Sequence, residues 1–201
     1  MILMSSRLLT AISSLKRTPR TGWLTHGVSL QDVESVADHT FSTCALSLIL
    51  TDLELKRGVR VNVERVLRMA TFHDLAEAFT FDISKAYLSY LGKRGEAIKD
   101  EIEASAWKHL VKGIKSLQMS DNYLMVHKEY VENKTVEAKI VHAADSLDIL
   151  LQVVDLRKRG NRQSCLRNLW NTTIKRLQTS PIHSVSTVLK MIVGEARELE
   201  R

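Results

Sequence analysis

Apolar residues recur along this chain at the three- and four-residue spacing of amphipathic helices, with no sustained two-residue alternation. The spacing predicts helices from end to end, separated by short polar or glycine-containing segments. The expected fold is therefore all-α, a single-domain bundle of about six to eight helices. The predicted helical ranges are 5–16, 35–55, 62–79, 96–117, 121–130, 135–158, 163–178 and 183–200.

Local signals set several of the expected helix ends. Pro19 disfavours helical geometry in the residue before it and should end the first helix. Asn62 is a good N-cap, and Gly160 is a natural stop. Residues 20–34 are expected to form a loop, and 82–91 could form a short helix. Over 35–55 the apolar pattern predicts a buried helix, from the spacing of Val36, Phe41, Ala45, Leu48, Ile49 and Leu53.

Length and composition narrow the class of protein. The 201 residues suit one domain, and 2 prolines with 8 glycines are too few for a many-stranded β fold. No apolar run approaches the about 20 residues of a membrane span. The Ser-rich N-terminus is interpreted as a first helix rather than a targeting segment. Cys44 and Cys165 lack metal-type spacing and fit a reducing compartment.

The formal charge of +6 suits an anionic ligand, but the positive residues are scattered. Aromatic residues make up 5% of the chain, which argues against a stacking platform for a nucleic-acid polymer. The densest basic stretch is Arg157-Lys158-Arg159, followed by Arg162 and Arg167. Such a stretch is most often a solvated helix end, and we expect these residues to be exposed to solvent.

Four residues carry the candidate chemistry: His39, the pair His73-Asp74, and Asp145. Two imidazoles and two carboxylates form a nitrogen and oxygen set suited to one divalent ion of Mn, Fe, Co, Ni or Zn. His39 is expected to begin one helix, and His73-Asp74 to lie late in the next. Adjacent helical residues point about 100° apart, so a shared metal would have to lie at the helix flank.

The motifs extend beyond these four residues. Lys16-Arg17-Thr18-Pro19-Arg20-Thr21-Gly22-Trp23 precedes Glu34-Ser35-Val36-Ala37-Asp38-His39, and His73-Asp74-Leu75-Ala76-Glu77 continues to Asp82-Ile83. Ala138-Lys139-Ile140-Val141 leads into Asp145. Over about residues 8–158 the chain resembles the HD-domain metal-dependent phosphohydrolases, in their 5'-deoxynucleotidase branch. The resemblance implies one HD domain over 1–201, with helices at about 163–200 that add nothing diagnostic.

The resemblance also implies roles. Asp74 would be both metal ligand and catalytic residue, Glu77 would orient or deprotonate the attacking water, Arg20 would hold the phosphate, and Asp82 would accept a hydrogen bond from the sugar 3'-hydroxyl. Glu77 follows His73 by four residues, which on a helix places it on the same face. From the residues alone, an exposed helix glutamate and a surface arginine stay open as alternatives.

The chain departs from the family pattern at two places. Phe81 stands where the family has glycine before the aspartate. Bacterial members have a tryptophan directly after the arginine, which crowds a ribose 2'-hydroxyl; here Thr21 follows Arg20, and the tryptophan is Trp23. Trp23 could take that substrate-binding role or be a core residue.

The expected function is a metal-dependent 5'-nucleotidase that releases phosphate from (deoxy)ribonucleoside 5'-monophosphates by attack of a metal-bound water. A metal can lower the pKa of bound water towards about 7, which makes a nucleophile at neutral pH. The alternatives are an HD phosphohydrolase for a triphosphate, cyclic nucleotide or alarmone, and a non-catalytic nucleotide-binding protein. The expected setting is nucleotide metabolism in the cytoplasm, as a homodimer with no membrane partner.

Overall fold

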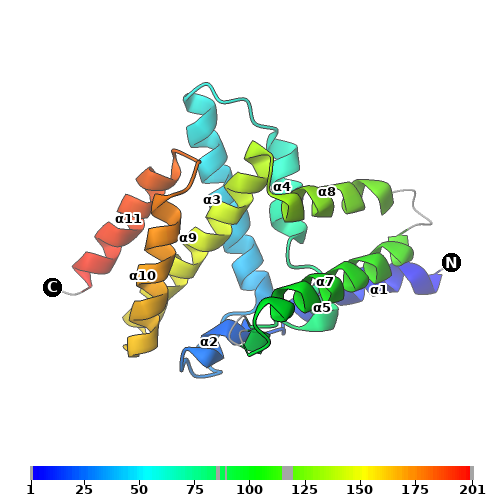
Figure 1. Ribbon diagram of the computed structural model, residues 1–201, viewed down its shortest axis with the longest axis horizontal. Helices are drawn as coiled ribbons and strands as arrows, with labels where there is room; N and C mark the ends of the chain where they lie inside the picture. The colour runs from blue at the N-terminus through cyan, green and yellow to red at the C-terminus, as the bar shows by residue number, and fades with distance from the viewer. Residues whose placement is uncertain (1, 85–86, 89, 115–119, 200–201) are drawn as a thin grey trace. The chain divides into compact units, whose positions relative to one another are not determined.

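A computed structural model describes residues 2–84, 87–88, 90–114 and 120–199, and these contain helices and no strand (Figure 1). The all-α prediction is confirmed. Eight helices of ten or more residues occur in the described part, with the short helices α2 and α5 in addition. The helices are α1 (Ile2–Leu15), α2 (Thr21–Thr25), α3 (Val36–Lys56), α4 (Val63–Phe72), α5 (Glu77–Thr80), α7 (Lys93–Ile114), α8 (Ser120–Glu132), α9 (Val136–Lys158), α10 (Ser164–Gln178) and α11 (Val185–Glu198).

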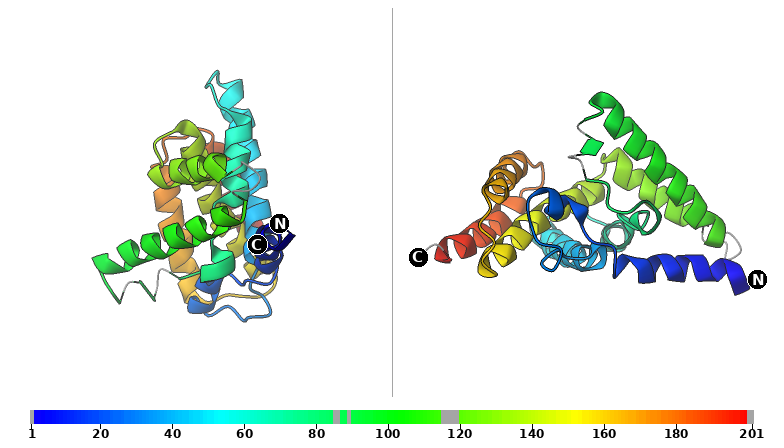
Figure 2. Two further views of the ribbon diagram at one scale, coloured as in Figure 1. Left: turned by 90° about the vertical axis from the view of Figure 1, so that its right-hand side faces the viewer. Right: turned by 90° about the horizontal axis from the view of Figure 1, so that it is seen from below.

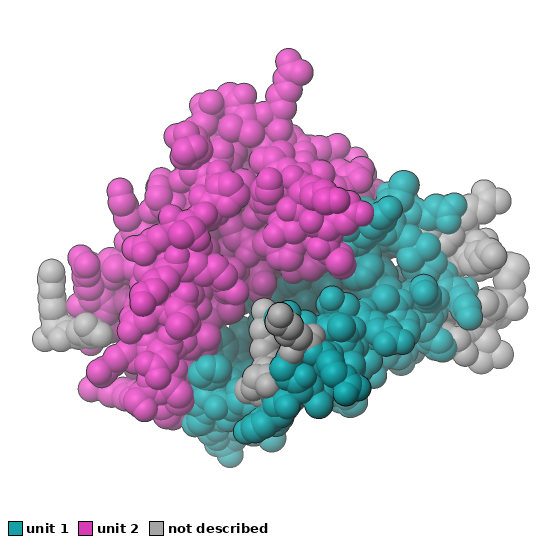
Figure 3. Space-filling view, in the orientation of Figure 1, with its two compact units in different colours: residues 1–40, 72–128 teal, residues 41–71, 129–201 magenta. Residues whose placement is uncertain are grey.

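The chain groups into two compact units, each discontinuous in sequence (Figure 3). Unit 1 comprises residues 1–40 and 72–128, and unit 2 comprises residues 41–71 and 129–201. The prediction of a single domain over 1–201 is not tested by this grouping and stays a prediction. No helix in the described ranges combines the length and apolarity needed to cross a membrane.

In unit 1, α1 packs against α7, and α5 contacts both helices (Figure 2). Their contact buries one continuous apolar cluster, which supplies the main hydrophobic stabilisation of this unit. Its buried members are Ala11, Leu15, Val36, Leu75, Ala76, Ala106, Trp107, Leu110 and Val111. Two of these, Leu75 and Ala76, lie in the segment that joins α4 to α5, so the core fixes that segment directly.

In unit 2, α9 packs against α10 and α11. The ends of α9 lie where the sequence predicts them. The Thr135 hydroxyl accepts a hydrogen bond from the Ala138 amide at 3.2 Å and caps the first turn. Gly160 has φ 90°, a conformation that glycine adopts without strain, and the helix stops there.

The helix predicted over 62–79 is shorter than expected. Asn62 caps it, because its side-chain oxygen accepts a hydrogen bond from the Arg65 amide, but α4 ends at Phe72. Tight turns follow, with the Leu75 amide bonded to Phe72 O and the Glu77 amide to Asp74 O. Residues 73, 75, 76 and 77 are all buried. Consecutive residues of an α-helix point around its whole circumference, so a turn buries such a run better than a helix lying on the core.

The segment over 20–34, predicted as a loop, contains the short helix α2. Its two ends are held together by an isolated antiparallel bridge between Pro19 and Ser35. The Arg20 amide donates to Glu34 O at 3.0 Å, next to this bridge. These backbone hydrogen bonds join the two ends of the segment, and they fix the position of the Arg20 backbone.

The expectation that α3 is buried at its apolar positions is confirmed for Val36, which is fully buried, and is wrong for two others. Phe41 is 75% exposed and Ile49 is 48% exposed. The face that is buried carries hydroxyl and carboxylate groups between its leucines: Thr43, Leu46, Ser47, Leu50, Thr51 and Glu54. Hydrogen bonds explain part of this choice, since Glu54 accepts from the Ser184 amide and the Ser184 hydroxyl donates to Leu50 O. These partners, distant in sequence, override the apolar periodicity.

Some predictions fall on residues outside the described ranges. The last three positions of the helix predicted over 96–117 are among them, and so are Lys85, Ala86 and Ser89 of the short helix considered over 82–91. Residues 200 and 201, where the last predicted helix ends, are also outside.

Candidate metal centre

The first residues of α3 place His39. Ser35 precedes the helix, and its hydroxyl accepts a hydrogen bond from the Asp38 amide while the Asp38 carboxylate accepts from the Ser35 amide and hydroxyl. This reciprocal capping box satisfies donors that the helix start would leave open, and it fixes the direction in which α3 begins. His39, one residue later, is fully buried.

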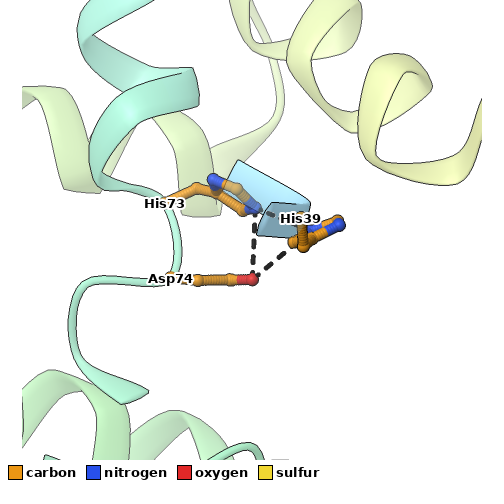
Figure 4. Close-up of side chains that lie close together, drawn as sticks. All are labelled: His39, His73 and Asp74. Atoms are coloured by element: carbon orange, nitrogen blue, oxygen red, sulfur yellow. Dashed lines mark hydrogen bonds and ion pairs between the residues drawn. The ribbon is translucent and has the colours of Figure 1, made fainter. Parts of the chain in front are cut away.

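His73 and Asp74 lie in the turn after α4, not in a helix as the sequence predicted. The turn brings both side chains to His39 (Figure 4). The Nε2 atoms of His39 and His73 are 3.2 Å apart, and Asp74 Oδ2 lies 3.5 Å from the first and 3.2 Å from the second. Because neighbouring residues in a turn need not diverge by 100°, both members of the pair can face one point.

These three atoms fit a divalent metal. A point equidistant from all three lies roughly 1.9 Å from each, close to the about 2.0–2.2 Å of metal–imidazole and metal–carboxylate bonds. Two imidazole nitrogens and a carboxylate oxygen are also a donor set that such ions accept. In the tautomers that present both Nε2 lone pairs to this point, a cation between the imidazoles and the Asp74 carboxylate would be bound favourably.

Positive charge adjoins the cluster. Arg20 Nη1 donates to Asp74 Oδ2 at 3.0 Å, and both side chains are largely shielded from solvent. Burial alone would raise the pKa of Asp74, but His73, Arg20 and His39 together hold that pKa far below its usual range. Asp74 is therefore a carboxylate, as a metal ligand must be. Arg20 is therefore not a surface arginine, because its side chain is largely buried and is bonded to Asp74.

Glu77 begins α5 and is 5% exposed. Its Oε2 has no hydrogen-bond partner among the described residues. Burial, reinforced by the negative charges of Asp74 and Asp82, raises the pKa of Glu77 well above its usual value. An ordinary exposed helix glutamate is excluded. The prediction that His73 and Glu77 share one face of a helix is wrong, because residues 73–76 form a turn and not a turn of helix.

Sequence reasoning missed a charged pair on α7. Lys99 Nζ lies 3.2 Å from Glu103 Oε1, one helical turn away. The positive charge of Lys99 acts on both Glu77 and Asp74. The i,i+4 spacing of Lys99 and Glu103 is visible in the sequence, but it is common on solvated helix faces and carries no signal for a site.

Asp82 lies against the residues that follow Arg20. Its Oδ2 accepts from the Gly22 amide at 3.3 Å, and its backbone oxygen accepts from the Thr21 hydroxyl. Phe81, before it, has φ 58° and ψ 168°, a region that is populated almost only by glycine. The departure from the family's glycine therefore leaves the glycine-type backbone in place, with a strained phenylalanine.

The two remaining predicted residues lie in different surroundings. Trp23 is 4% exposed, and its Nε1 donates to Glu34 Oε1 at 2.8 Å, so its indole packs in the core of unit 1. Asp145 is partly buried on α9, in unit 2. Its place as a fourth ligand stays a prediction from the sequence.

Comparisons with known proteins identify the family of this chain. A family model described as an HD domain matches residues 12–182. The Schizosaccharomyces pombe protein named 5'-deoxynucleotidase hdd1 is 30% identical over 158 residues, which cover 79% of this chain and 75% of that protein. The Xenopus laevis protein named 5'-deoxynucleotidase HDDC2 is 29% identical over 162 residues, which cover 81% of this chain and 74% of that protein.

Solved structures show the same fold. A crystal structure of a Pyrococcus horikoshii OT3 protein has a TM-score of 0.74 and 32% identity, over 96% of this chain and 98% of the other. An HD-domain phosphohydrolase from Listeria innocua also has a TM-score of 0.74, at 20% identity, over 95% of this chain and 87% of the other, which shows likeness of fold alone. The chain belongs to the HD-domain family, and the family resemblance of its motifs is confirmed.

Proposed function

We propose that this HD-domain protein is a metal-dependent phosphomonoester hydrolase that releases phosphate from nucleoside 5'-monophosphates. The observation that carries the proposal is the convergence of His39 Nε2, His73 Nε2 and Asp74 Oδ2, beside the Arg20 guanidinium. The relatives named 5'-deoxynucleotidases support the choice of substrate class.

His39, His73 and Asp74 would hold one divalent metal, and we propose Asp145 as a fourth ligand from the order of the family motifs. Their imidazole and carboxylate donors accept Mn, Fe, Co, Ni or Zn. Such an ion supplies Lewis acidity, which activates water and offsets the negative charge that develops on a phosphoryl group. In this proposal Asp74 also holds Arg20, so the carboxylate positions the group that meets the substrate.

Arg20 would bind the phosphate. Its planar guanidinium can donate two parallel hydrogen bonds to phosphoryl oxygens, and the Asp74 contact already restrains it. Glu77 would take a proton from the attacking water at Oε2, the oxygen that has no described partner. A raised pKa suits a proton acceptor in this role, since the best general bases titrate near the working pH.

The sugar would be held by Asp82, whose carboxylate can accept a hydrogen bond from a 3'-hydroxyl. A 3'-phosphate would place a negative group against that carboxylate, so 5'-monophosphates should be preferred. Trp23 would act on the substrate only through the segment that carries Arg20, because its own ring is buried. We also propose that deoxyribose is preferred to ribose, because the relatives are named 5'-deoxynucleotidases.

We also propose a cytoplasmic homodimer. Neither Cys44 nor Cys165 is in a disulfide, in keeping with a reducing compartment. The exposed apolar side chains Phe41 and Ile49 on α3 support self-association. Sedimentation of the wild type and of Phe41→Ser tests this part; a monomeric wild type would contradict it.

Comparing kcat/KM for 5'-dAMP, 5'-AMP, 3'-AMP and dATP tests the substrate class, with the metal supplied in parallel as Mn, Co, Ni and Zn. We expect the two 5'-monophosphates to be hydrolysed fastest. Faster release from dATP or 3'-AMP would move the protein to a different class of HD phosphohydrolase. No release from any of them, with metal bound, would favour a nucleotide-binding protein.

A further inference from the structure

Unit 2 contains an open cavity of about 460 Å³ beside the connection from α9 to α10. Its size is within the about 300–1,000 Å³ that ligand pockets occupy. Three arginines line it, Arg157 from α9, Arg162 from the connection and Arg167 from α10, together with Asn161, Leu166 and Leu199. No acidic side chain is among its described lining residues.

The basic stretch around this cavity divides into two groups. Lys158 and Arg159 are paired with Glu195 and Asp155, respectively, as expected of a solvated helix end. Arg162 and Arg167 form no ion pair with the described residues, and they line the cavity. Both groups are exposed to solvent, as the solvated-helix-end interpretation expects, and the second differs from the first in that it lines the cavity.

Arg157 is oriented by an aromatic ring. Its guanidinium carbon lies 4.9 Å from the centroid of the Trp170 ring, which is a cation–π distance. A guanidinium that is already stacked loses less conformational entropy when it binds a ligand. Its N–H groups, which lie in the plane of the guanidinium, can still donate hydrogen bonds to an anion. Arg162 and Arg167 line the same cavity, so several guanidinium groups are available to a ligand with more than one negative charge.

The backbone adds to the positive potential. The last carbonyls of α9 are used, since the amides of Arg159, Gly160 and Asn161 donate to Asp155, Arg157 and Leu156. The start of α10 is different, because its N-cap Gln163, another lining residue, forms no side-chain capping bond. Helix starts without a side-chain cap leave amide hydrogens for an anion. The start of α10 therefore brings the positive end of a helix to the cavity.

We propose that this cavity is a second ligand site, which binds an organic anion with at least two phosphoryl groups. The phosphoryl groups would meet Arg157, Arg162 and Arg167, and the organic part would lie on Leu166 and Leu199. The site lies wholly in unit 2 and does not depend on the metal centre or on the proposed reaction.

Calorimetric titration of the full chain with pyrophosphate and with dATP tests the site. The Asp74→Ala variant serves as the starting protein, so that the metal centre cannot hold or hydrolyse the probe. We expect saturable binding with one site per chain, and tighter binding of dATP than of pyrophosphate. In this background R162A/R167A should weaken both by at least about tenfold, because two charge-assisted pairs are lost.

The control is R176A/K190A, which removes two exposed positive charges elsewhere in unit 2 and should leave affinity unchanged. R162A/R167A alone should keep the phosphate-release rate of the wild type. Absence of saturable binding, or an equal loss in both double variants, would overturn the site. Equal affinity for the two probes would overturn the organic part of the proposal.

Discussion

Buried carboxylates behave differently in the two units of this protein. In unit 2, Glu54 accepts from the Ser184 amide at 2.7 Å, and Glu129 accepts from the Thr135 hydroxyl at 2.6 Å and pairs with Arg65. In unit 1, Glu77 is equally buried, but its Oε2 has no described hydrogen-bond partner and it faces two other carboxylates. A buried carboxyl group without a partner costs stability, so its presence needs another explanation.

The backbone differs in the same way. Unit 2 consists mainly of long helices, and α9 among them is capped at Thr135 and ends before Gly160. In unit 1, the residues that carry the chemistry lie in the turn after α4, on the four-residue helix α5, and after the strained Phe81. Irregular and strained segments persist where the core over-determines them, and they cluster at functional sites. The comparison teaches that the 73–82 segment departs from the regular, hydrogen-bonded structure that unit 2 has at Glu54, Glu129 and α9.

The sharpest way to break this comparison is Asp74→Ala. The variant removes one of three converging metal donors and the partner of Arg20, so metal content should fall to background and phosphate release by at least about 10³-fold. Elemental analysis and a phosphate-release assay measure the two effects. Asp52→Ala, at an exposed position of α3, is the matched control and should change neither. Full metal content in Asp74→Ala would remove Asp74 from the ligand set.

Glu77→Gln keeps the size of the side chain and removes its ability to accept a proton. We expect kcat to fall by about 10²–10⁴-fold with metal content retained, since general-base contributions are of this size. Thermal stability should be unchanged or higher, because a buried carboxyl group that faces two others is removed. Glu96→Gln, exposed on α7, is the control. A change confined to KM would instead make Glu77 a binding residue.

The same contrast explains what the sequence could predict. The bounds of α9 follow from periodicity and the stop at Gly160, and those of α10 follow from periodicity. Both are local signals. His39, His73 and Asp74 of the candidate metal centre were also readable, because each belongs to a short and specific motif. The end of α4 was not readable, since it depends on the burial of four nearly consecutive residues in a core that α1 and α7 complete.

Two further features depend on contacts between residues far apart in the sequence. The buried face of α3 is selected partly by the hydrogen bonds from Ser184 to Glu54 and Leu50, 130 and 134 residues away. The apolar pattern was right for Val36 and wrong for Phe41 and Ile49. The nearness of Lys99 to Glu77 and Asp74 likewise arises only from the packing of α7 on α5. Sequence patterns carry no information about partners at that separation.

Glu54→Ala tests the stabilising side of the comparison. It leaves the buried Ser184 amide without its acceptor, which should lower the free energy of unfolding by about 1–3 kcal/mol. The rate of phosphate release per folded molecule should not change. Chemical denaturation and the activity assay measure these, with Asp52→Ala again as the exposed control on the same helix. A large loss of activity without loss of stability would contradict the division of roles.

Acid should weaken unit 1 through His127. This side chain stacks on Trp107 with ring centroids 4.4 Å apart, and burial lowers its pKa to about 4. Because the folded pKa lies below the ordinary value of about 6.5, the stabilisation is complete above about pH 6.5 and is lost as pH falls towards about 4. His127→Phe should therefore show a smaller drop in Tm between pH 7 and pH 5 than the wild type. His183→Phe, at an exposed position of unit 2, should show the same drop as the wild type.

The smallest effect is expected from Phe81→Gly. A non-glycine residue in this backbone region costs about 1–3 kcal/mol, while glycine adds about 1 kcal/mol of unfolded-state entropy, so a net gain of about 1 kcal/mol is expected. The ring is 65% exposed, so little packing is lost. Phe81→Ala is the matched control, because it removes the ring and keeps the Cβ that causes the strain. Denaturation should show a gain for glycine and none for alanine. An equal gain in both would trace the strain to the ring and not to the backbone, and would weaken the view that this segment stores strain for chemistry.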